Sequence, residues 1–189
     1  MTSLKGSKTE VNILTAFIGE SQARNRYTFA ASVATKEGYI KIASIFTETA
    51  DQEKEHAKRL FRFLEGGEVT VTGAFPAGLK EDTISQLTAA AAGEHHEWTS
   101  MYPDFAKIAH EEGFKQIGDV MEAIAVAEKF HEQRYLDMLE ELKTGTYFKR
   151  AEKVKWRCRN CGYLHEGTEP PDSCPACAHP KAYFEVLKW

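Results

Sequence analysis

The sequence predicts a mainly α-helical protein, a four-helix bundle followed by a small β-rich metal-binding domain. Three observations carry this prediction. Apolar side chains recur at three- and four-residue steps in four segments before residue 145. The two halves of that region share one pattern. All four cysteines and four of the six prolines come after residue 145. We therefore expect residues 1–146 to form the bundle and residues 147–189 the second domain.

Helix boundaries follow from the periodicity and from glycine. Gly38 and Gly113 interrupt helical sequence and are typical of helix C-caps, and Gly66-Gly67 ends the second helix. Pro103 lies inside the third helix and should kink it, because proline removes a backbone donor. The predicted helices cover residues 8–37, 39–65, 82–112 and 114–143.

An internal repeat relates the two predicted helical hairpins. Residues in the second hairpin follow their counterparts by 75 positions (128 − 53 = 75), and acidic positions are part of the pattern. The equivalent pairs are Glu53 and Glu128, His56 and His131, and, with one residue deleted, Gly19-Glu20 and Gly93-Glu94.

Residues 66–81 connect the two hairpins. When extended, sixteen residues reach roughly 50 Å, and a helix of about 27 residues is roughly 40 Å long. The connection is therefore long enough to run the whole length of the bundle, which permits a crossover topology.

Each predicted helix carries a glutamate on the stripe that should face the core. On an isolated helix such a glutamate is normally solvated, and a single Glu-x-x-His is a weak signal. Here two such motifs occur, and residues at i and i+3 share a helix face. Four buried carboxylates without partners would be very unfavourable. Two bound cations remove that penalty, so the pattern predicts a dinuclear metal site in the bundle.

The predicted ligands are carboxylates with two imidazoles, a set that suits iron or manganese. Glu53 and Glu128 accompany the histidines and are expected to bridge the two ions, whereas Glu20 and Glu94 are expected to be terminal. The six ligands are Glu20, Glu53, His56, Glu94, Glu128 and His131.

Glu97 breaks the symmetry of the repeat. Its counterpart in the first half is Ala23 (97 − 74 = 23), and it lies one helical turn beyond Glu94. It is a candidate seventh ligand, and on spacing alone the alternative is an exposed acid.

The cysteines form two C-x-x-C knuckles separated by twelve residues. Such knuckles place four thiolates around one metal ion, and spacing alone leaves zinc and iron as alternatives. About 40 residues cannot build a large core, so the metal should contribute much of the folding free energy. The ligands are Cys158, Cys161, Cys174 and Cys177, and the expected aromatic core is Trp156, Tyr163, Tyr183 and Phe184.

The formal net charge of −4 gives no support for a nucleic-acid partner. The first ten residues lack the apolar stretch of a signal peptide, and no other stretch is long and apolar enough to span a membrane. We therefore expect a cytoplasmic location, where four cysteines are more often metal ligands than disulfides.

The motifs together resemble those of the rubrerythrins over essentially the whole chain. The segments that carry the resemblance are Gly19-Glu-Ser-Gln-Ala-Arg-Asn-Arg-Tyr27, Glu48-Thr-Ala-Asp-Gln-Glu-Lys-Glu-His56, Gly93-Glu-His-His-Glu97, Ala127-Glu-Lys-Phe-His131, Cys158-Arg-Asn-Cys-Gly-Tyr163 and Cys174-Pro-Ala-Cys-Ala-His-Pro-Lys181.

The resemblance implies a ferritin-like di-iron bundle fused to a rubredoxin-like Fe(Cys)4 domain. It implies reduction of hydrogen peroxide to water, with electrons that come ultimately from NADH through a reductase or rubredoxin. It also implies a head-to-tail homodimer. In the family one iron exchanges a carboxylate for a histidine with redox state, and Glu97 and His56 match those positions. Zinc remains a possible substitute at the cysteines.

Three further residues are assigned through the resemblance. Tyr27 and Tyr102 match tyrosines near the family's iron site, and the alternative for both is core packing with a satisfied hydroxyl. Together with Glu97 they are the candidate catalytic residues, and Glu97 or Tyr102 is a candidate proton donor. Ala178 stands where free rubredoxins usually have glycine, which implies about 1 kcal/mol of strain. A ferroxidase or iron-handling protein is the alternative function.

Overall fold

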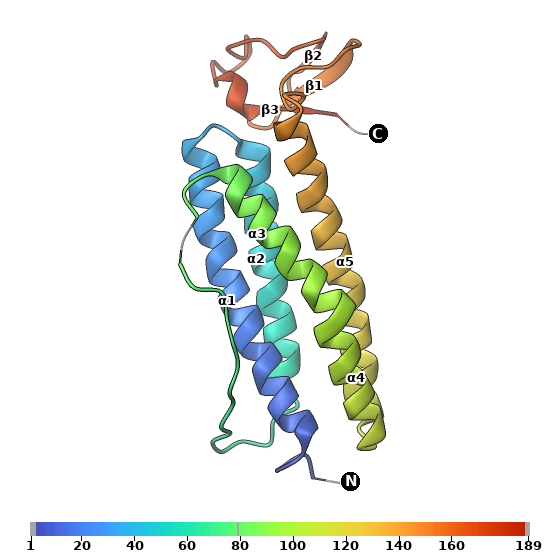
Figure 1. Ribbon diagram of the computed structural model, residues 1–189. Helices are drawn as coiled ribbons and strands as arrows, with labels where there is room; N and C mark the ends of the chain where they lie inside the picture. The colour runs from blue at the N-terminus through green and yellow to red at the C-terminus, as the bar shows by residue number, and fades with distance from the viewer. Residues whose placement is uncertain (1–2, 79, 188–189) are drawn as a thin grey trace.

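The computed structural model describes residues 3–78 and 80–187. Long helices form a bundle, and a small β-containing domain lies at one end of it (Figure 1). The predicted fold class is confirmed. In chain order the helical elements are α1 (Lys8–Lys36), α2 (Ile40–Phe61), α3 (Thr83–His96), the π-helix η1 (Glu97–Met101), α4 (Tyr102–Glu111) and α5 (Lys115–Lys143).

The helix ends follow the local signals in the sequence. Ser7 caps α1, because its side chain accepts a hydrogen bond from the backbone N–H of Glu10. Gly38 and Gly113 follow the ends of α1 and α4 with φ of +83° and +85°, as predicted. One predicted boundary is too long, since α2 ends at Phe61 and not at residue 65.

The third predicted helix is interrupted before Pro103. Its α-helical pattern changes at Glu97 to the five-residue π-helix η1, and Pro103 then occupies the first turn of α4. The hydrogen-bond pattern widens at this point, since the backbone N–H of Tyr102 donates to Glu97 O, five residues earlier. A π-helical segment thus lies just upstream of Pro103, and the kink itself stays a prediction.

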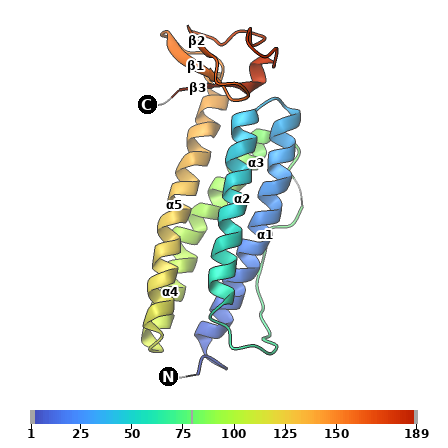
Figure 2. The same ribbon diagram turned by 180° about the vertical axis from the view of Figure 1, so that it is seen from behind.

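The connection between the hairpins crosses from one end of the bundle to the other. Figures 1 and 2 show residues 62–78 and 80–82 running along α1, so that α3 starts at the end of the bundle where α1 finishes. Gln22 Nε2 donates to Pro76 O over 3.0 Å and holds this segment against α1. Glu37 accepts from the backbone N–H of Thr83 over 3.0 Å. The crossover topology that the segment length permits is thus the one observed.

The apolar core of the bundle is divided into two clusters. The first surrounds Phe46, Leu87 and Tyr135, and the second surrounds Ile13, Leu60 and Met121. Along the chain, a buried glutamate separates residues of one cluster from residues of the other. The four glutamates are Glu20 in α1, Glu53 in α2, Glu94 in α3 and Glu128 in α5. A polar layer therefore lies between two apolar ones.

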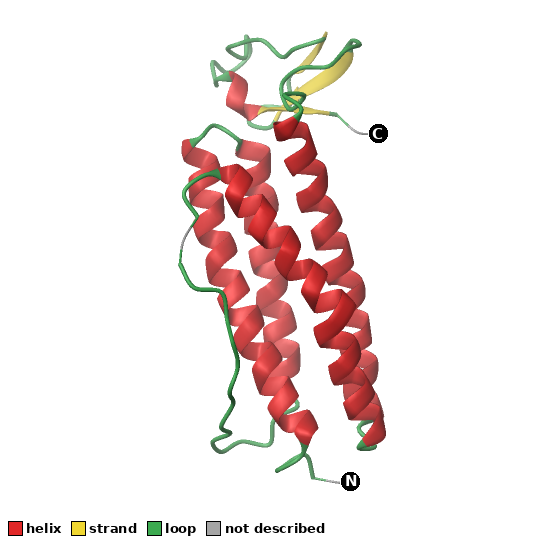
Figure 3. Cartoon of the chain, in the orientation of Figure 1, coloured by secondary structure: helices red, strands yellow, loops and turns green. Residues whose placement is uncertain are grey.

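The small domain contains a three-stranded antiparallel sheet with the order β2-β1-β3 (Figure 3). Trp156 and Phe184 are buried in its core with two of the cysteines, and Tyr163 and Tyr183 pack against them, as expected. Arg159 Nη2 donates to Ser44 Oγ of α2 over 2.8 Å, which joins this domain to the bundle. The elements are β1 (Val154–Cys158), β2 (Leu164–Gly167), the 3-10 helix η2 (Lys181–Tyr183) and β3 (Phe184–Val186).

The boundary after residue 146 stays a prediction, with α5 ending at Lys143 and β1 beginning at Val154. Within the described residues, no helix combines the length and the apolar character that crossing a membrane requires.

Candidate metal centres

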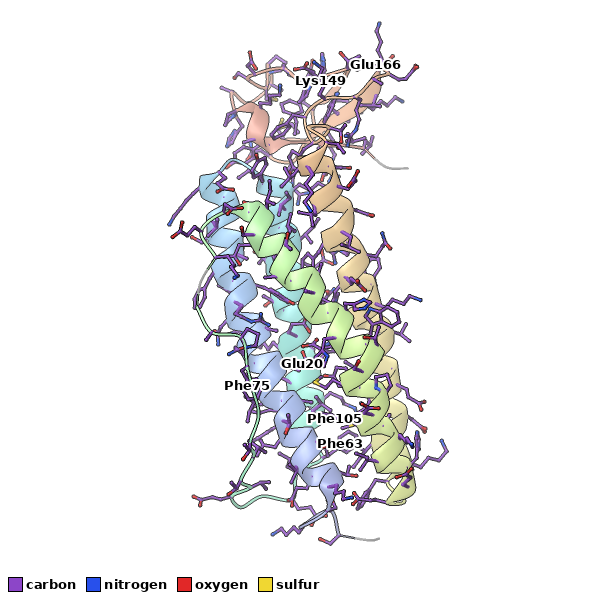
Figure 4. All side chains as sticks on the ribbon, viewed as in Figure 1. Glu20, Phe63, Phe75, Phe105, Lys149 and Glu166 are labelled. Atoms are coloured by element: carbon purple, nitrogen blue, oxygen red, sulfur yellow. The ribbon has the colours of Figure 1, made fainter. Side chains whose placement is uncertain are left out.

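The glutamates of the polar layer point into the bundle. Glu53, Glu94 and Glu128 are 0% exposed and Glu20 is 1% exposed. Figure 4 shows Glu20 in the interior of the bundle among side chains of neighbouring helices. Ionised carboxylates are rarely buried to this extent without a cation. The helix periodicity therefore predicted the orientation of these side chains correctly.

Six of the seven predicted ligands converge in two overlapping groups. Within each group the potential ligand atoms lie within 4.8 Å of one another, and both groups contain Glu53 and Glu128. The first group is Glu20, Glu53, His56 and Glu128, and the second is Glu53, Glu94, Glu128 and His131. Two shared carboxylates between two four-ligand groups are the arrangement that a carboxylate-bridged pair of ions requires.

Several polar atoms at this point have no hydrogen-bond partner among the described residues. His131 Nδ1 lies 2.7 Å from Glu128 Oε2 and 3.1 Å from Glu53 Oε1, yet the angles are not those of hydrogen bonds. Such atoms converge on a common point and do not form pairs, as metal ligands do. The unpartnered buried atoms are Glu20 Oε2, Glu53 Oε1, Glu94 Oε2, Glu128 Oε1, Glu128 Oε2 and His131 Nδ1.

The two histidines face the carboxylates through Nδ1. His56 Nδ1 is 2.8 Å from Glu128 Oε1 and 3.1 Å from Glu53 Oε2. On the other ring edge, His131 Nε2 lies 2.9 Å from Gln52 Oε1. A donor role for Nε2 leaves Nδ1 of His131 as the ligand atom, and such partners orient a metal-bound imidazole. Gln52 was not predicted, because no motif distinguishes it from a solvated side chain.

Burial and neighbouring charges shift the pKa values of the side chains in the layer. Burial raises the pKa of Glu20 well above its ordinary value, and the charges of Glu53 and Glu128 raise it further. Burial also raises the pKa of Glu94 to about 8. For His56, burial lowers the pKa, but the carboxylates of Glu128 and Glu53 outweigh this and raise it to about 9. Ionised, these carboxylates would repel one another in a buried site, and a pair of cations removes that penalty.

Tyr27 and Tyr102 each donate a hydrogen bond to a terminal carboxylate. Tyr27 Oη donates to Glu94 Oε1, and Tyr102 Oη donates to Glu20 Oε1. Both tyrosines are buried, and burial together with these carboxylates raises the pKa of both hydroxyls. They are therefore neutral donors that touch the ligand set. The repeat contained this signal, since the two residues are 75 positions apart (102 − 27 = 75).

Glu97 is not part of either ligand group among the described residues. It is half-buried at the start of η1 and lines a cavity beside α1. Burial raises the pKa of Glu97, and so do the charges of Glu94, Glu128 and Glu53, which shows that it lies close to the layer. In this structure His56 belongs to the first group and Glu97 does not.

The π-helix accounts for the shift in the repeat. Glu20 and Glu94 are 74 positions apart, whereas Tyr27 and Tyr102 are 75 apart. The second half therefore has one extra residue between Glu94 and Tyr102, where η1 lies. A π-turn absorbs one inserted residue within an α-helix. Glu97, which has no acidic counterpart, sits in this inserted turn.

The four cysteines form the second centre. All four sulfurs lie within 4.8 Å of one another, with Cys158 and Cys177 Sγ 3.8 Å apart and Cys161 and Cys174 Sγ 3.7 Å apart. Disulfide sulfurs lie about 2.0 Å apart. Four sulfurs about 2.3 Å from one metal ion lie about 3.8 Å apart at the corners of a tetrahedron. The geometry fits a tetrathiolate metal site.

The two cysteine knuckles share one backbone pattern. Gly162 N donates to Cys158 O and Ala178 N donates to Cys174 O, both over 2.8 Å. Each donor residue has a left-handed conformation, with φ of +80° at Gly162 and +58° at Ala178. Ala178 thus has the conformation that glycine favours, and the strain expected there stays a prediction.

Comparisons with known proteins agree with this geometry. A family profile described as rubrerythrin matches residues 12–139, and one described as the rubredoxin-like domain of rubrerythrin matches residues 156–185. The chain belongs to the rubrerythrin family. Rubrerythrin of Nitratidesulfovibrio vulgaris is 63% identical over 187 residues, with 99% of this chain and 98% of that protein covered. Rubrerythrin of Porphyromonas gingivalis is 59% identical, with 98% and 93% covered.

Solved structures support the same fold. Fully reduced, all-ferrous nigerythrin has a TM-score of 0.62 and 30% identity, with 98% of this chain and 92% of that chain covered. Rhodobacter capsulatus bacterioferritin has a TM-score of 0.65 at 21% identity, with 72% and 86% covered, a likeness of fold alone.

Family membership and the fit of the ligands identify the cofactors of this rubrerythrin. A carboxylate-bridged pair of iron ions belongs to the polar layer, and one iron belongs to the four cysteines, where zinc can substitute. The family supports an oxidoreductase role in broad terms.

Proposed function

We propose that this rubrerythrin is a peroxidase that reduces hydrogen peroxide to water. The observation that carries the proposal is the presence of two different metal-ligand clusters in one chain, one of carboxylates and histidines and one of four cysteines. A dinuclear iron site can bind and reduce a small oxidant, and a tetrathiolate iron carries one electron at a time. Iron storage needs no such electron supply, so the fused domain favours a peroxidase over a ferroxidase.

When bound, the iron pair supplies the two electrons that convert hydrogen peroxide and two protons into two water molecules. Glu53 and Glu128 would hold both ions, since both ligand groups contain them. Glu20 and Glu94 would be the terminal ligands, and their tyrosine donors fix them in place.

Glu97 is proposed to exchange with His56 as a ligand of one ion. Its half-buried position supports this, and so does the charge of Glu97, which contributes to the raised pKa of Glu20 in the first group. Glu97 and Tyr102 are also proposed to hold the proton that the departing oxygen requires. Tyr102 donates directly to a ligand of the first group, which supports its role.

Electrons are proposed to arrive from the cysteine site of a second copy of the chain. Within one chain, His131 and the end of α5 at Lys143 are twelve residues apart, about 18 Å along the helix. The cysteines lie in the domain at that end of the bundle (Figure 1). A head-to-tail homodimer shortens this path. Apolar side chains on the surface of the bundle support such an interface, with Val126 72% exposed and Phe130 59% exposed one turn apart on α5.

The proposed electron donor is rubredoxin or a reductase that uses NAD(P)H, and the proposed location is the cytoplasm. A membrane or nucleic-acid partner is not part of the proposal.

Zinc substitution at the cysteine site tests the electron route without unfolding the domain. Zinc keeps the tetrathiolate geometry and has no redox chemistry. We expect zinc-substituted protein to oxidise its reduced di-iron site once with hydrogen peroxide, at the rate of the all-iron protein. Turnover driven by NADH and a reductase should stop. Cys161→Ala should also keep the single oxidation by peroxide and stop NADH-driven turnover, although loss of this ligand destabilises the small domain as well.

Three outcomes would contradict the proposal. Full NADH-driven turnover in the zinc form would exclude the relay. Failure of peroxide to oxidise the reduced all-iron protein would exclude the peroxidase. Formation of iron mineral without peroxidase turnover would favour iron handling.

A further inference from the structure

Two helical glycines lie beside the terminal glutamates without a backbone reason to be glycine. Gly19 precedes Glu20 in α1 and Gly93 precedes Glu94 in α3, and they occupy equivalent places in the repeat. Neither has a positive φ, unlike the glycines that cap the helices. Glycine inside a helix is less stable than alanine. Some other property of these positions must favour the absence of a side chain.

Open space lies next to both glycines. A Cβ atom built on either residue meets no heavy atom within 4 Å in the part of the chain that the structure describes, apart from the nearby backbone. Both glycines line one cavity of about 360 Å³. A second cavity of about 500 Å³ adjoins it and is also lined by Gly93. The positions are therefore not glycine for the sake of close packing.

The crossover segment forms one wall of this space. Ala74, Phe75 and Pro76 line the smaller cavity opposite α1 and α3, and the bond from Gln22 to Pro76 O holds the segment there. Figure 4 shows Phe75 on this segment at about the level of Glu20 in the bundle. The cavity thus lies beside the polar layer and on the outer side of α1.

Polar groups continue from the cavity toward the ligands. Arg26 lines both cavities, and its buried Nε has no hydrogen-bond partner within the described residues. Glu97 lines the smaller cavity, and it lies close enough to Glu94 and Glu128 for their charges to raise its pKa. Hydrogen peroxide both donates and accepts hydrogen bonds, so these groups suit its passage.

The geometry points to an access route for hydrogen peroxide beneath the crossover segment, which Gly19 and Gly93 keep open where it passes beside Glu20 and Glu94. The choice of hydrogen peroxide as the molecule that uses this route rests on the proposed function, whereas the route itself is inferred from the cavities. Gly19 and Gly93 are specificity-determining residues here, because the space beside them limits the size of the oxidant that reaches the metal site.

Leucine at Gly93 is the main test, with Thr88→Leu as its matched control. Both substitutions place the same side chain on α3, but Thr88 is exposed and does not line either cavity. The all-iron protein is reduced, and its oxidation by hydrogen peroxide is followed in a stopped-flow instrument. Gly93→Leu should lower the second-order rate constant by about tenfold, while Thr88→Leu should stay within about twofold of the unmodified protein.

Azide supplies a readout that is independent of peroxidase activity. Its rate of binding to the oxidised di-iron site, followed by visible absorption, should fall in Gly93→Leu and not in Thr88→Leu. Iron content and the spectrum before azide addition should be unchanged in both variants. tert-Butyl hydroperoxide should be slowed more strongly than hydrogen peroxide by the smaller substitution Gly93→Ala.

The outcomes separate the route from the function. Rates for Gly93→Leu equal to those for Thr88→Leu, with peroxide and with azide, would overturn the access route. Absence of peroxide oxidation in the unmodified protein would overturn the peroxidase, and azide binding would still test the route. If Gly93→Leu does not assemble its iron site, Gly19→Leu blocks the same cavity from α1. The double variant Gly19→Ala/Gly93→Ala, which adds only two methyl groups, should show an intermediate rate and a higher Tm.

Discussion

The two metal centres differ in how much of the fold surrounds them. The di-iron layer lies between two apolar clusters to which all the long helices contribute. The cysteine site has a core of only Trp156, Phe184, Cys158 and Cys174 in the described residues, with a few partly buried neighbours. Apolar burial can hold the bundle together without metal, whereas the small domain depends on its ion. The iron in the bundle thus serves chemistry, and the iron on the cysteines serves structure as well.

Loss of a cysteine ligand should have the largest effect. Cys174→Ser should release the metal and unfold the small domain, because about 40 residues without an ion have too small a core. The helical signal in far-UV circular dichroism should remain, and limited proteolysis should cleave after α5. Ala176→Ser, in the same knuckle, is the control and should resist the protease. An intact small domain in Cys174→Ser would show that the apolar core suffices.

Removal of iron from the bundle should reverse the pH dependence of stability. In the metal-free fold the pKa of Glu94 is raised from 4.5 to about 8 and that of His56 from 6.5 to about 9. The unfolded chain releases both protons first as the pH rises. The stability that these groups contribute to the apoprotein is therefore lost as the pH rises, between about pH 4.5 and 8 for Glu94 and between about pH 6.5 and 9 for His56.

The iron-loaded protein should behave in the opposite way, because protons compete with the metal for its ligands and stability falls as the pH falls. Thermal melts of both forms across this range measure the two slopes. Parallel slopes would mean that these side chains do not carry the charge of the layer. The pKa of Glu53 is about 2, so it does not titrate in this window.

Removal of one tyrosine hydroxyl should have a moderate effect. Tyr102→Phe leaves Glu20 Oε1 without its donor in a buried site, which costs about 1–3 kcal/mol. Tyr27→Phe does the same to Glu94 on the other side of the repeat. Denaturant melts should show a similar loss for both variants. If only Tyr102→Phe slows peroxide reduction, the proposed proton role belongs to that side alone.

The smallest effect is expected in the cysteine knuckles. Ala178 has a φ of +58° and Gly162 has a φ of +80° in equivalent places. Ala178→Gly should stabilise the small domain by about 1 kcal/mol, because glycine adopts this conformation without strain. Gly162→Ala should destabilise it by a similar amount. Rates of metal release to a chelator should change in the same order, and equal rates in both variants would argue against strain at Ala178.

Sequence reasoning predicted the polar layer better than the details around it. The i, i+3 spacing fixes which helix face Glu53 and His56 share, and the repeat carries the same argument to Glu128 and His131. Helical periodicity indicates which face of the helix a side chain occupies, but not how deeply that side chain is buried. For that reason it could not tell that Glu97 lies outside both ligand groups in this structure.

Other features depend on tertiary contacts or on backbone geometry. Gln52 of α2 contacts His131 of α5, and no local sequence pattern indicates this contact. The π-helix was missed although the one-residue difference in the repeat indicated it, since Pro103 offered a more familiar cause for an irregular helix. The cysteine spacing, by contrast, was sufficient to predict the tetrathiolate cluster, because two C-x-x-C knuckles can place their four sulfurs around a metal ion in few other ways.

The extra residue between Glu94 and Tyr102 makes the two halves of the bundle differ, but the difference stays local to one helical turn. In a regular α-helix, one inserted residue rotates everything that follows by about 100°. The wide turn at Glu97–Met101 takes up that rotation locally, so Tyr102 still points to Glu20, as Tyr27 points to Glu94. A duplicated scaffold can in this way gain one new carboxylate beside its polar layer while the remaining side chains keep their register. Deletion of Glu97 itself would restore the spacing of the first half and remove this acid.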